Sequence, residues 1–211
     1  SASVSQDIFS RAVNTGDMEQ ATSAVVNADG TFTLGSGADV VNTGMLDVST
    51  NEPNKSAGEI VVIGEKVTSS GVIRADSENG NGGSIELHAT DTTMLTDNSV
   101  TSVQASSSGV GGVIKVLGNK VGLIDQAQVN VSGANGGGEV LIGGDRTGQN
   151  KQIRNAEFIY LGEKTNVKAD AIDRGNGGKL ITFASDTARI FSNLSARGGA
   201  NGGNGGFIET S

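Results

Sequence analysis

A few side chains in this sequence are of the kinds that carry out acid–base chemistry. His88, the only histidine, follows Glu86 by two residues, and Asp76 and Asp170 each stand at the end of a short apolar segment. Cleavage of an acidic polysaccharide would need carboxylates, a Lys or Arg and often a cation on one strand face. Strand alternation directs His88 into solvent beside Glu86, and aspartates at such ends commonly cap turns. We therefore expect no catalytic residues, and a polysaccharide-processing enzyme is the least favoured function.

The glycine-rich segments could instead bind phosphate or calcium. A phosphate-binding loop needs a helix directly after its glycines, and no helix is expected after these. A calcium-binding nonapeptide roll needs an aspartate after its glycines, and the run 198–206 contains none. The sequence also lacks cysteine, which excludes thiolate metal ligands and disulfides. We therefore expect no metal site and no cofactor.

The charge of the chain argues against several classes of partner. The net charge is −8, and the 15 Lys and Arg residues are scattered rather than gathered in a basic stripe. Nucleic-acid binding is therefore not expected, and a polyanion is disfavoured as the main ligand. The sequence contains no run of about 18 apolar residues, so we expect no membrane insertion, and we find no signal peptide.

The residues above belong to a repeated segment. A glycine, usually one of two in succession, precedes a short strand at six places, marked by Gly58, Gly83, Gly112, Gly138, Gly178 and Gly206. The steps range from 25 residues (58 to 83) to 40 residues (138 to 178). Self-similarity at such a period is typical of a solenoid. The 33 glycines and the aromatic content of 3% agree, because a conventional core uses more large side chains.

Each repeat contains three short strands with apolar residues two apart. The first follows the glycines, the second resembles Val121–Ile124 and the third resembles Val129–Ser132. We align the third strands on Leu46, Ile73, Val103, Val129, Val167 and Leu194, which brings Ser49, Asp76, Ser106, Ser132, Asp170 and Arg197 to one position. One coil cannot bury its own apolar face, so coils must stack. The sequence therefore predicts an all-β parallel β-helix of about seven coils, with three short strands per coil.

The stacked first strands predict two buried ladders. One comprises Ile60, Ile85, Ile114, Val140, Leu180 and Ile208, and the other comprises Val62, Leu87, Val116, Ile142 and the polar Thr182. The glycines are expected at corners that need positive φ. Asn81, Asn176 and Asn204, each two residues before a marking glycine, are expected to stack in amide ladders.

The organisation of the chain follows from these repeats. Residues 29–211 form the β-helix, and residues 1–28 form an N-terminal coil or cap, with an amphipathic helix over 6–22 as the alternative. The 40-residue step places a polar insertion at about 145–157. Beside it, alternation directs an apolar set outward on the first strands, namely Val61, Ile63, Leu117, Leu141, Ile181 and Phe183.

Two functions are open for this insertion. The loop could fold back and shield the apolar residues, with Ile153 as its anchor. Alternatively, the loop could join Leu117, Leu141 and Phe183 in a ligand or self-association site whose polar rim is Arg146, Lys151 and Arg154. Shielding is favoured, since an uncovered apolar patch would promote aggregation of a secreted protein.

Two Asn-x-Ser sequons offer possible modification sites. They begin at Asn130 and Asn193, and both lie in third strands with the asparagine directed away from the core. Such short motifs arise often by chance, so they predict glycosylation only weakly.

Several segments resemble filamentous-haemagglutinin-like adhesins exported by two-partner secretion. They are residues 112–123, 140–148, 169–172, 175–178 and 196–211. The resemblance implies a right-handed parallel β-helix secreted by a Gram-negative bacterium through an outer-membrane transporter. It implies attachment to host-cell or matrix glycans or proteins, or self-association, and glycosylation as in some relatives. The Asn-Pro motifs of the family's secretion domain are absent, which suggests a piece of the shaft; the alternative is a purely structural spacer.

Overall fold

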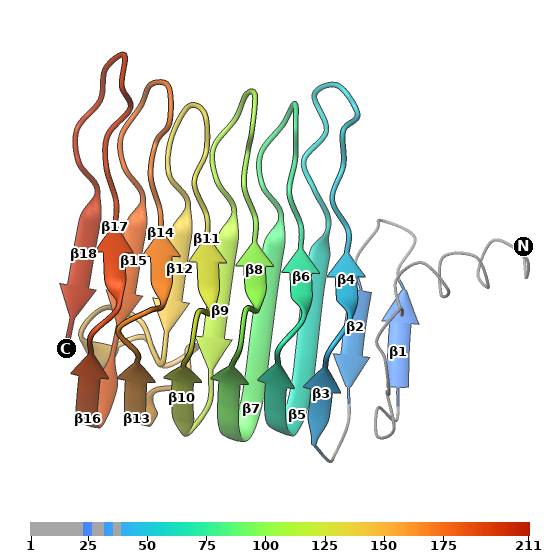
Figure 1. Cartoon of the computed structure of the whole chain (residues 1–211), viewed down its shortest axis with the longest axis vertical. Helices are drawn as coiled ribbons and strands as arrows, with labels where there is room; N and C mark the ends of the chain where they lie inside the picture. Colours follow the sequence, from blue (N-terminus) through green and yellow to red (C-terminus); the bar gives the residue numbers. More distant parts are fainter. Residues whose placement is uncertain (1–22, 27–31, 36–38) are drawn as a thin grey trace, which may run out of the picture.

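The computed structural model describes residues 23–26, 32–35 and 39–211, which form 18 strands and one short 3-10 turn. The strands follow three faces of a parallel solenoid of about six turns, close to the expected seven (Figure 1). The helix considered over 6–22 lies outside the described residues. No helix in the described ranges is both long and apolar enough to span a membrane.

The first face contains the six strands that follow the marking glycines, preceded by two further strands. It runs in the order β1 (Ser23–Val26), β2 (Phe32–Gly35), β5 (Glu59–Ser69), β7 (Ser84–Leu95), β9 (Val113–Leu117), β12 (Glu139–Ile142), β15 (Lys179–Thr182) and β18 (Phe207–Thr210). Every pair along this face is parallel except the antiparallel pair of β1 and β2.

The second and third faces complete each coil. The second comprises β3 (Val40–Asn42), the ends of β5 and β7, β10 (Lys120–Leu123), β13 (Ala156–Leu161) and β16 (Ala184–Ile190). The third comprises β4 (Met45–Asp47), β6 (Val72–Arg74), β8 (Val100–Ser102), β11 (Gln128–Asn130), β14 (Asn166–Lys168) and β17 (Asn193–Ser195). β5 and β7 continue around the corner between the first two faces, so two coils contain one long strand where two short strands were expected.

Both predicted ladders are confirmed. The register aligns Ile60, Ile85, Ile114, Val140, Leu180 and Ile208 through six successive strands. It also aligns Val62, Leu87, Val116, Ile142 and Thr182. All of these side chains are buried except Ile208, which lies on the last described strand. The buried hydroxyl of Thr182 is satisfied because it donates a hydrogen bond to the carbonyl of Glu209, at 3.2 Å.

The register expected for one third strand was wrong by two residues. Thr101, rather than Val103, pairs with Ile73 on one side and Val129 on the other. Gln104 therefore occupies the corner position that was assigned to Ser106. The error has a physical cause, since a buried threonine occupies a ladder position where only an apolar residue was sought.

The marking glycines serve close approach rather than positive φ. A Cβ on Gly111 would collide with the carbonyl oxygen of Val131, and one on Gly112 would collide with that of Gly83. Neither Gly111 nor Gly112 has positive φ. Glycine is therefore required because the chain entering each coil runs against backbone on two sides.

The asparagine ladders were also wrong. The side-chain oxygen of Asn81 accepts the backbone N–H of Val110, and that of Asn176 accepts the N–H of Asn204, each at 2.9 Å. These asparagine side chains therefore bond to the backbone of the next coil rather than to one another's side-chain amides. Each such bond pairs a backbone N–H at a corner, where the strand ladders end.

Candidate functional site

The insertion lies over the outer side of the first face. It occupies residues 143–155, because Ala156 and Glu157, which were expected within it, already belong to β13. Its first turn is η1 (Arg146–Gly148), where the side chain of Asp145 accepts the N–H of Arg146 at 2.6 Å. Gly148, at φ 65°, lies against the ring of Phe183, where a Cβ would clash.

The apolar residues expected on the surface are covered near this loop. Leu117 and Leu141 are only 2% and 4% exposed, and Ile181 is fully buried. Phe183 is half-buried against the loop, whereas Ile63 on β5, three strands from β12, stays exposed. Leu117 and Leu141 are therefore unavailable as ligand contacts, which corrects their assignment to a binding surface.

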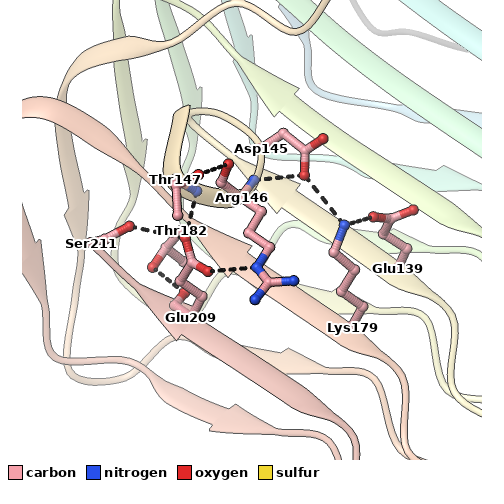
Figure 2. A network of polar contacts seen from close by, with 8 residues as sticks. All are labelled: Glu139, Asp145, Arg146, Thr147, Lys179, Thr182, Glu209 and Ser211. Carbon is pink, nitrogen blue, oxygen red and sulfur yellow. Dashed lines mark hydrogen bonds and ion pairs between the residues drawn. The ribbon is translucent and has the colours of Figure 1, made fainter. Parts of the chain in front are cut away.

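A polar network fastens the first turn of the loop to three strands (Figure 2). The Nζ atom of Lys179 on β15 lies 2.7 Å from Glu139 on β12 and 3.3 Å from Asp145. Further along the same face, the backbone N–H of Thr147 donates to Glu209 on β18 at 2.7 Å. The loop is thus bonded to the two strands that follow β12 on the first face.

The network shifts the pKa of two of its groups. Hydrogen bonds from the Asn150 side chain and the Arg146 N–H, with a lesser contribution from Lys179, hold the pKa of Asp145 below its usual value against the opposing effect of burial. Burial opposes the charge of Lys179, but its bonds to Glu139 and Asp145 outweigh this and raise its pKa. Both groups are therefore stabilised in their charged forms.

The three cations of the expected rim do not converge. Arg146 lies 3.8 Å from Glu209 and 5.1 Å from the centre of the Phe207 ring, both on β18. Arg154 donates to the carbonyl of Thr90 on β7, at 2.9 Å. β7 and β18 are four strand spacings apart, or about 19 Å. Lys151 is exposed and forms no hydrogen bond or ion pair with the described residues. This geometry favours shielding over a shared binding site.

The carboxylates considered for catalysis are used in corner bonds. Asp76 accepts hydrogen bonds from the Ser102 hydroxyl at 2.6 Å and the Gln104 N–H at 2.7 Å. Asp170 accepts equivalent bonds from Ser195 and Arg197, and these bonds hold its pKa below the usual value against the effect of burial. Three coil spacings separate the two aspartates, or about 14 Å, so they cannot act as a pair.

The other polar candidates are also explained by structure. Glu86 forms an ion pair with Lys115 at 3.0 Å, and His88 lies 3.6 Å from the same carboxylate. Within the described ranges, no cluster of three or more His, Cys, Asp or Glu could hold a metal ion. The Glu86–Lys115 pair joins adjacent coils, and His88 lies on the same strand as Glu86.

Both sequon asparagines lie on the outer side of the third face. Asn130 is half-buried, and its side-chain oxygen accepts the N–H of Ser132 at 2.9 Å. Asn193 is exposed and its amide lies 3.4 Å from Asn166 in the preceding coil. Asn193 is therefore the more accessible of the two.

The sequence analysis missed a group of exposed aromatic residues on the second face. Phe158 and Tyr160 point outward from β13, and Phe191 follows β16 in the next coil. Their spacing in the sequence offered a signal, because two aromatics two residues apart are unusual in a chain with seven in all.

The fold has a counterpart among solved structures. The crystal structure of the HMW1 secretion domain from Haemophilus influenzae is similar to this chain, with a TM-score of 0.67 and 27% sequence identity. The match covers 82% of this chain and 44% of that one. No protein-family model matches the chain, and no curated protein matches it.

Proposed function

We propose that this chain is a segment of a β-helical protein of the two-partner secretion class, which is exported by a Gram-negative bacterium and mediates attachment or aggregation. The observation that carries this proposal is the similarity to the HMW1 secretion domain over 82% of the chain. The segments that resemble filamentous-haemagglutinin-like adhesins support it.

The proposed role is non-catalytic. It is supported by the corner bonds of Asp76 and Asp170 and by the ion pair of Glu86. Each carboxylate has a partner that explains its position in the solenoid without a reaction. The partners of the segment would be a surface glycan or protein, or another copy of the chain, and an outer-membrane transporter would export the whole protein.

A second candidate role is in export. The similar solved structure is a secretion domain, so this segment could act in export itself rather than in the shaft. A third, the structural spacer, needs only the stacked coils. The three roles differ in which activity is lost when coils are removed.

Deletion of whole coils separates these roles. Removing residues 59–178 joins Gly58 to Lys179 at equivalent positions, because Ile60 and Leu180 share one ladder. Removing residues 59–83 alone is the matched control, since it preserves the same register. Both deletions would be made in the whole protein, which is expressed with its transporter, and export and cell attachment would be measured.

The expected result is normal export of both proteins, with attachment lost only in the larger deletion. Failure of export in the larger deletion alone would support the secretion-domain role. Export and attachment that both survive would leave only the spacer. Protease resistance of the exported protein would show that the remaining coils are folded.

A further inference from the structure

The second face carries an aromatic cluster that no role described above uses. Tyr160 and Phe191 are 44% and 55% exposed, and their ring centres lie 6.0 Å apart at an interplanar angle of 58°. With Phe158, three of the chain's seven aromatic residues are gathered on this face of two adjacent coils. Such a concentration of exposed rings generally marks a binding surface.

A hollow of about 450 Å³ lies beside Tyr160. The register places Gly122 on β10 between Met94 on β7 and Tyr160 on β13. Because Gly122 has no side chain, the thioether of Met94 can lie over it, in the space that a Cβ would take, and both residues line the hollow. The floor is therefore apolar, and one wall is the Tyr160 ring.

The rim of the hollow supplies hydrogen-bonding groups. Thr92, Thr187, Lys120 and Arg189 line it, and no carboxylate does. Lys120 lies 3.7 Å from Asp91, so its charge is partly balanced. The side chain of Arg189, on the paired strand β16, forms no hydrogen bond or ion pair with the described residues, and its five N–H donors are free for a ligand.

We propose that this hollow binds a ring of a neutral saccharide. One face of a pyranose ring presents C–H groups that pack on the electron-rich face of an aromatic ring, as Tyr160 offers. The hydroxyls at the edge of the sugar then accept from Arg189 and Lys120 and exchange hydrogen bonds with the two threonines. A mostly apolar site with a few convergent polar groups is the usual form of a small-ligand pocket.

Two other occupants fit less well. A long acidic polysaccharide would be repelled by a chain of net charge −8, although the hollow itself contains two cations. A peptide that adds as a strand needs an unpaired edge, but β10 is paired with β7 and β13, and β13 is paired with β10 and β16. The inference rests on the proposed attachment function and names the chemistry of its ligand.

The protein has a built-in probe for this test. Tyr160 is its only tyrosine, and it has no tryptophan, so tyrosine fluorescence reports on this hollow alone. The 211-residue chain would be titrated with maltoheptaose, cellohexaose and mannohexaose, and with a hyaluronan oligosaccharide as the acidic comparison. We expect a saturable change in fluorescence with at least one neutral sugar and none with hyaluronan.

Variants assign the binding to named side chains. Arg189→Ala and Phe191→Ala should each weaken binding about tenfold, because one loses the polar rim and the other loses the ring that packs on Tyr160. Val41→Ala is the matched control, since Val41 is an exposed apolar residue in the same row of the second face, outside the hollow. It should bind like the unmodified chain.

The opposite results overturn the proposal. It fails if folded protein shows no saturable response to any of the neutral sugars, if hyaluronan alone binds, or if Val41→Ala weakens binding as much as Arg189→Ala. Attachment by the whole protein would be measured in parallel. Intact attachment without sugar binding would refute this site while leaving the proposed function standing, whereas loss of both would remove the two together.

Discussion

The ammonium group of Lys179 on β15 lies 3.3 Å from the carboxylate of Asp145, at the start of the inserted loop. The same ammonium lies 2.7 Å from Glu139 on β12, so one side chain joins two coils and the loop that covers them. This contact explains why the insertion lies against the first face instead of extending into solvent, and it makes the covering sensitive to pH.

Acid should weaken the attachment of the loop. Asp145 has a lowered pKa in the folded protein, so its contribution to stability is present above the ordinary value of 3.8 and is lost as the pH falls through the lower folded value. We expect Asp145→Asn to reduce the free energy of unfolding at pH 7 but to have a smaller effect at about pH 2. Urea unfolding at the two pH values measures this, and an equal effect at both would contradict it.

Alkali should act through Lys179 in the opposite direction. Its raised pKa means that its contribution is complete below 10.5 and is lost as the pH rises through the folded value. Lys179→Met should therefore destabilise the protein at neutral pH and leave it with a flatter stability profile above about pH 10.5 than the unmodified chain. A parallel loss of stability in both proteins across that range would exclude this role of Lys179.

Removal of the loop tests whether it shields the first face. Replacing residues 146–155 with a short Gly-Ser link should expose Leu141 and Ile181, lower the melting temperature and cause aggregation. Lys151→Ala is the control, because Lys151 has no partner in the described structure. This variant should leave the melting temperature and the tendency to aggregate unchanged. A stable, monomeric replacement that had lost attachment would instead support a binding role for the loop.

The core ladder should respond strongly to truncation. Ile114 is fully buried between Ile85 and Val140, so Ile114→Ala should cost about 2–5 kcal/mol of unfolding free energy. Ile63→Ala, at an exposed position of the same face, should cost much less. Chemical denaturation of both variants measures the difference, and similar losses would mean that the register is incorrect.

The double glycine before β9 predicts a steric effect. Gly111→Ala places a methyl group against the carbonyl of Val131, which is backbone and cannot move aside easily. Gly136→Ala, in the next coil, meets the Val110 side chain at 3.5 Å and the Asn176 carbonyl at 3.7 Å, which are both ordinary contacts. The first variant should therefore fold poorly and the second should resemble the unmodified chain. Thermal unfolding compares them, and equal tolerance would show that the corner is looser than described.

Much of the stack could be predicted because its signal is local. Apolar residues two apart after each glycine identify the buried side of a strand, and equivalent strands must align when their coils stack. Ile85, Ile114 and Val140 were found in this way. The register of the third strand that contains Thr101 could not be predicted by the same rule. A threonine carries both a methyl and a hydroxyl group, so whether it is buried depends on its neighbours.

The candidate sites were harder to predict, because the exposure of a side chain depends on the segments packed around its strand as well as on the strand itself. Alternation correctly directed Leu141 outward, but only the folded loop decided that it is covered. Arg146 and Arg154 are eight residues apart in the sequence, yet the loop carries them to strands about 19 Å apart. Conversely, Tyr160 and Phe191 lie in different coils and meet only because those coils are stacked.

The sequence by itself determined the period, the all-β class and the inward residues of the first strands, since each follows from spacing within one coil. Only the tertiary structure decided why the double glycines are required, where the inserted loop lies and which outward residues remain open to solvent. The physical reason is that these features depend on contacts between coils: a carbonyl beside Gly111, a lysine shared with Asp145, and a hollow at Gly122 bounded by side chains from the coils on either side.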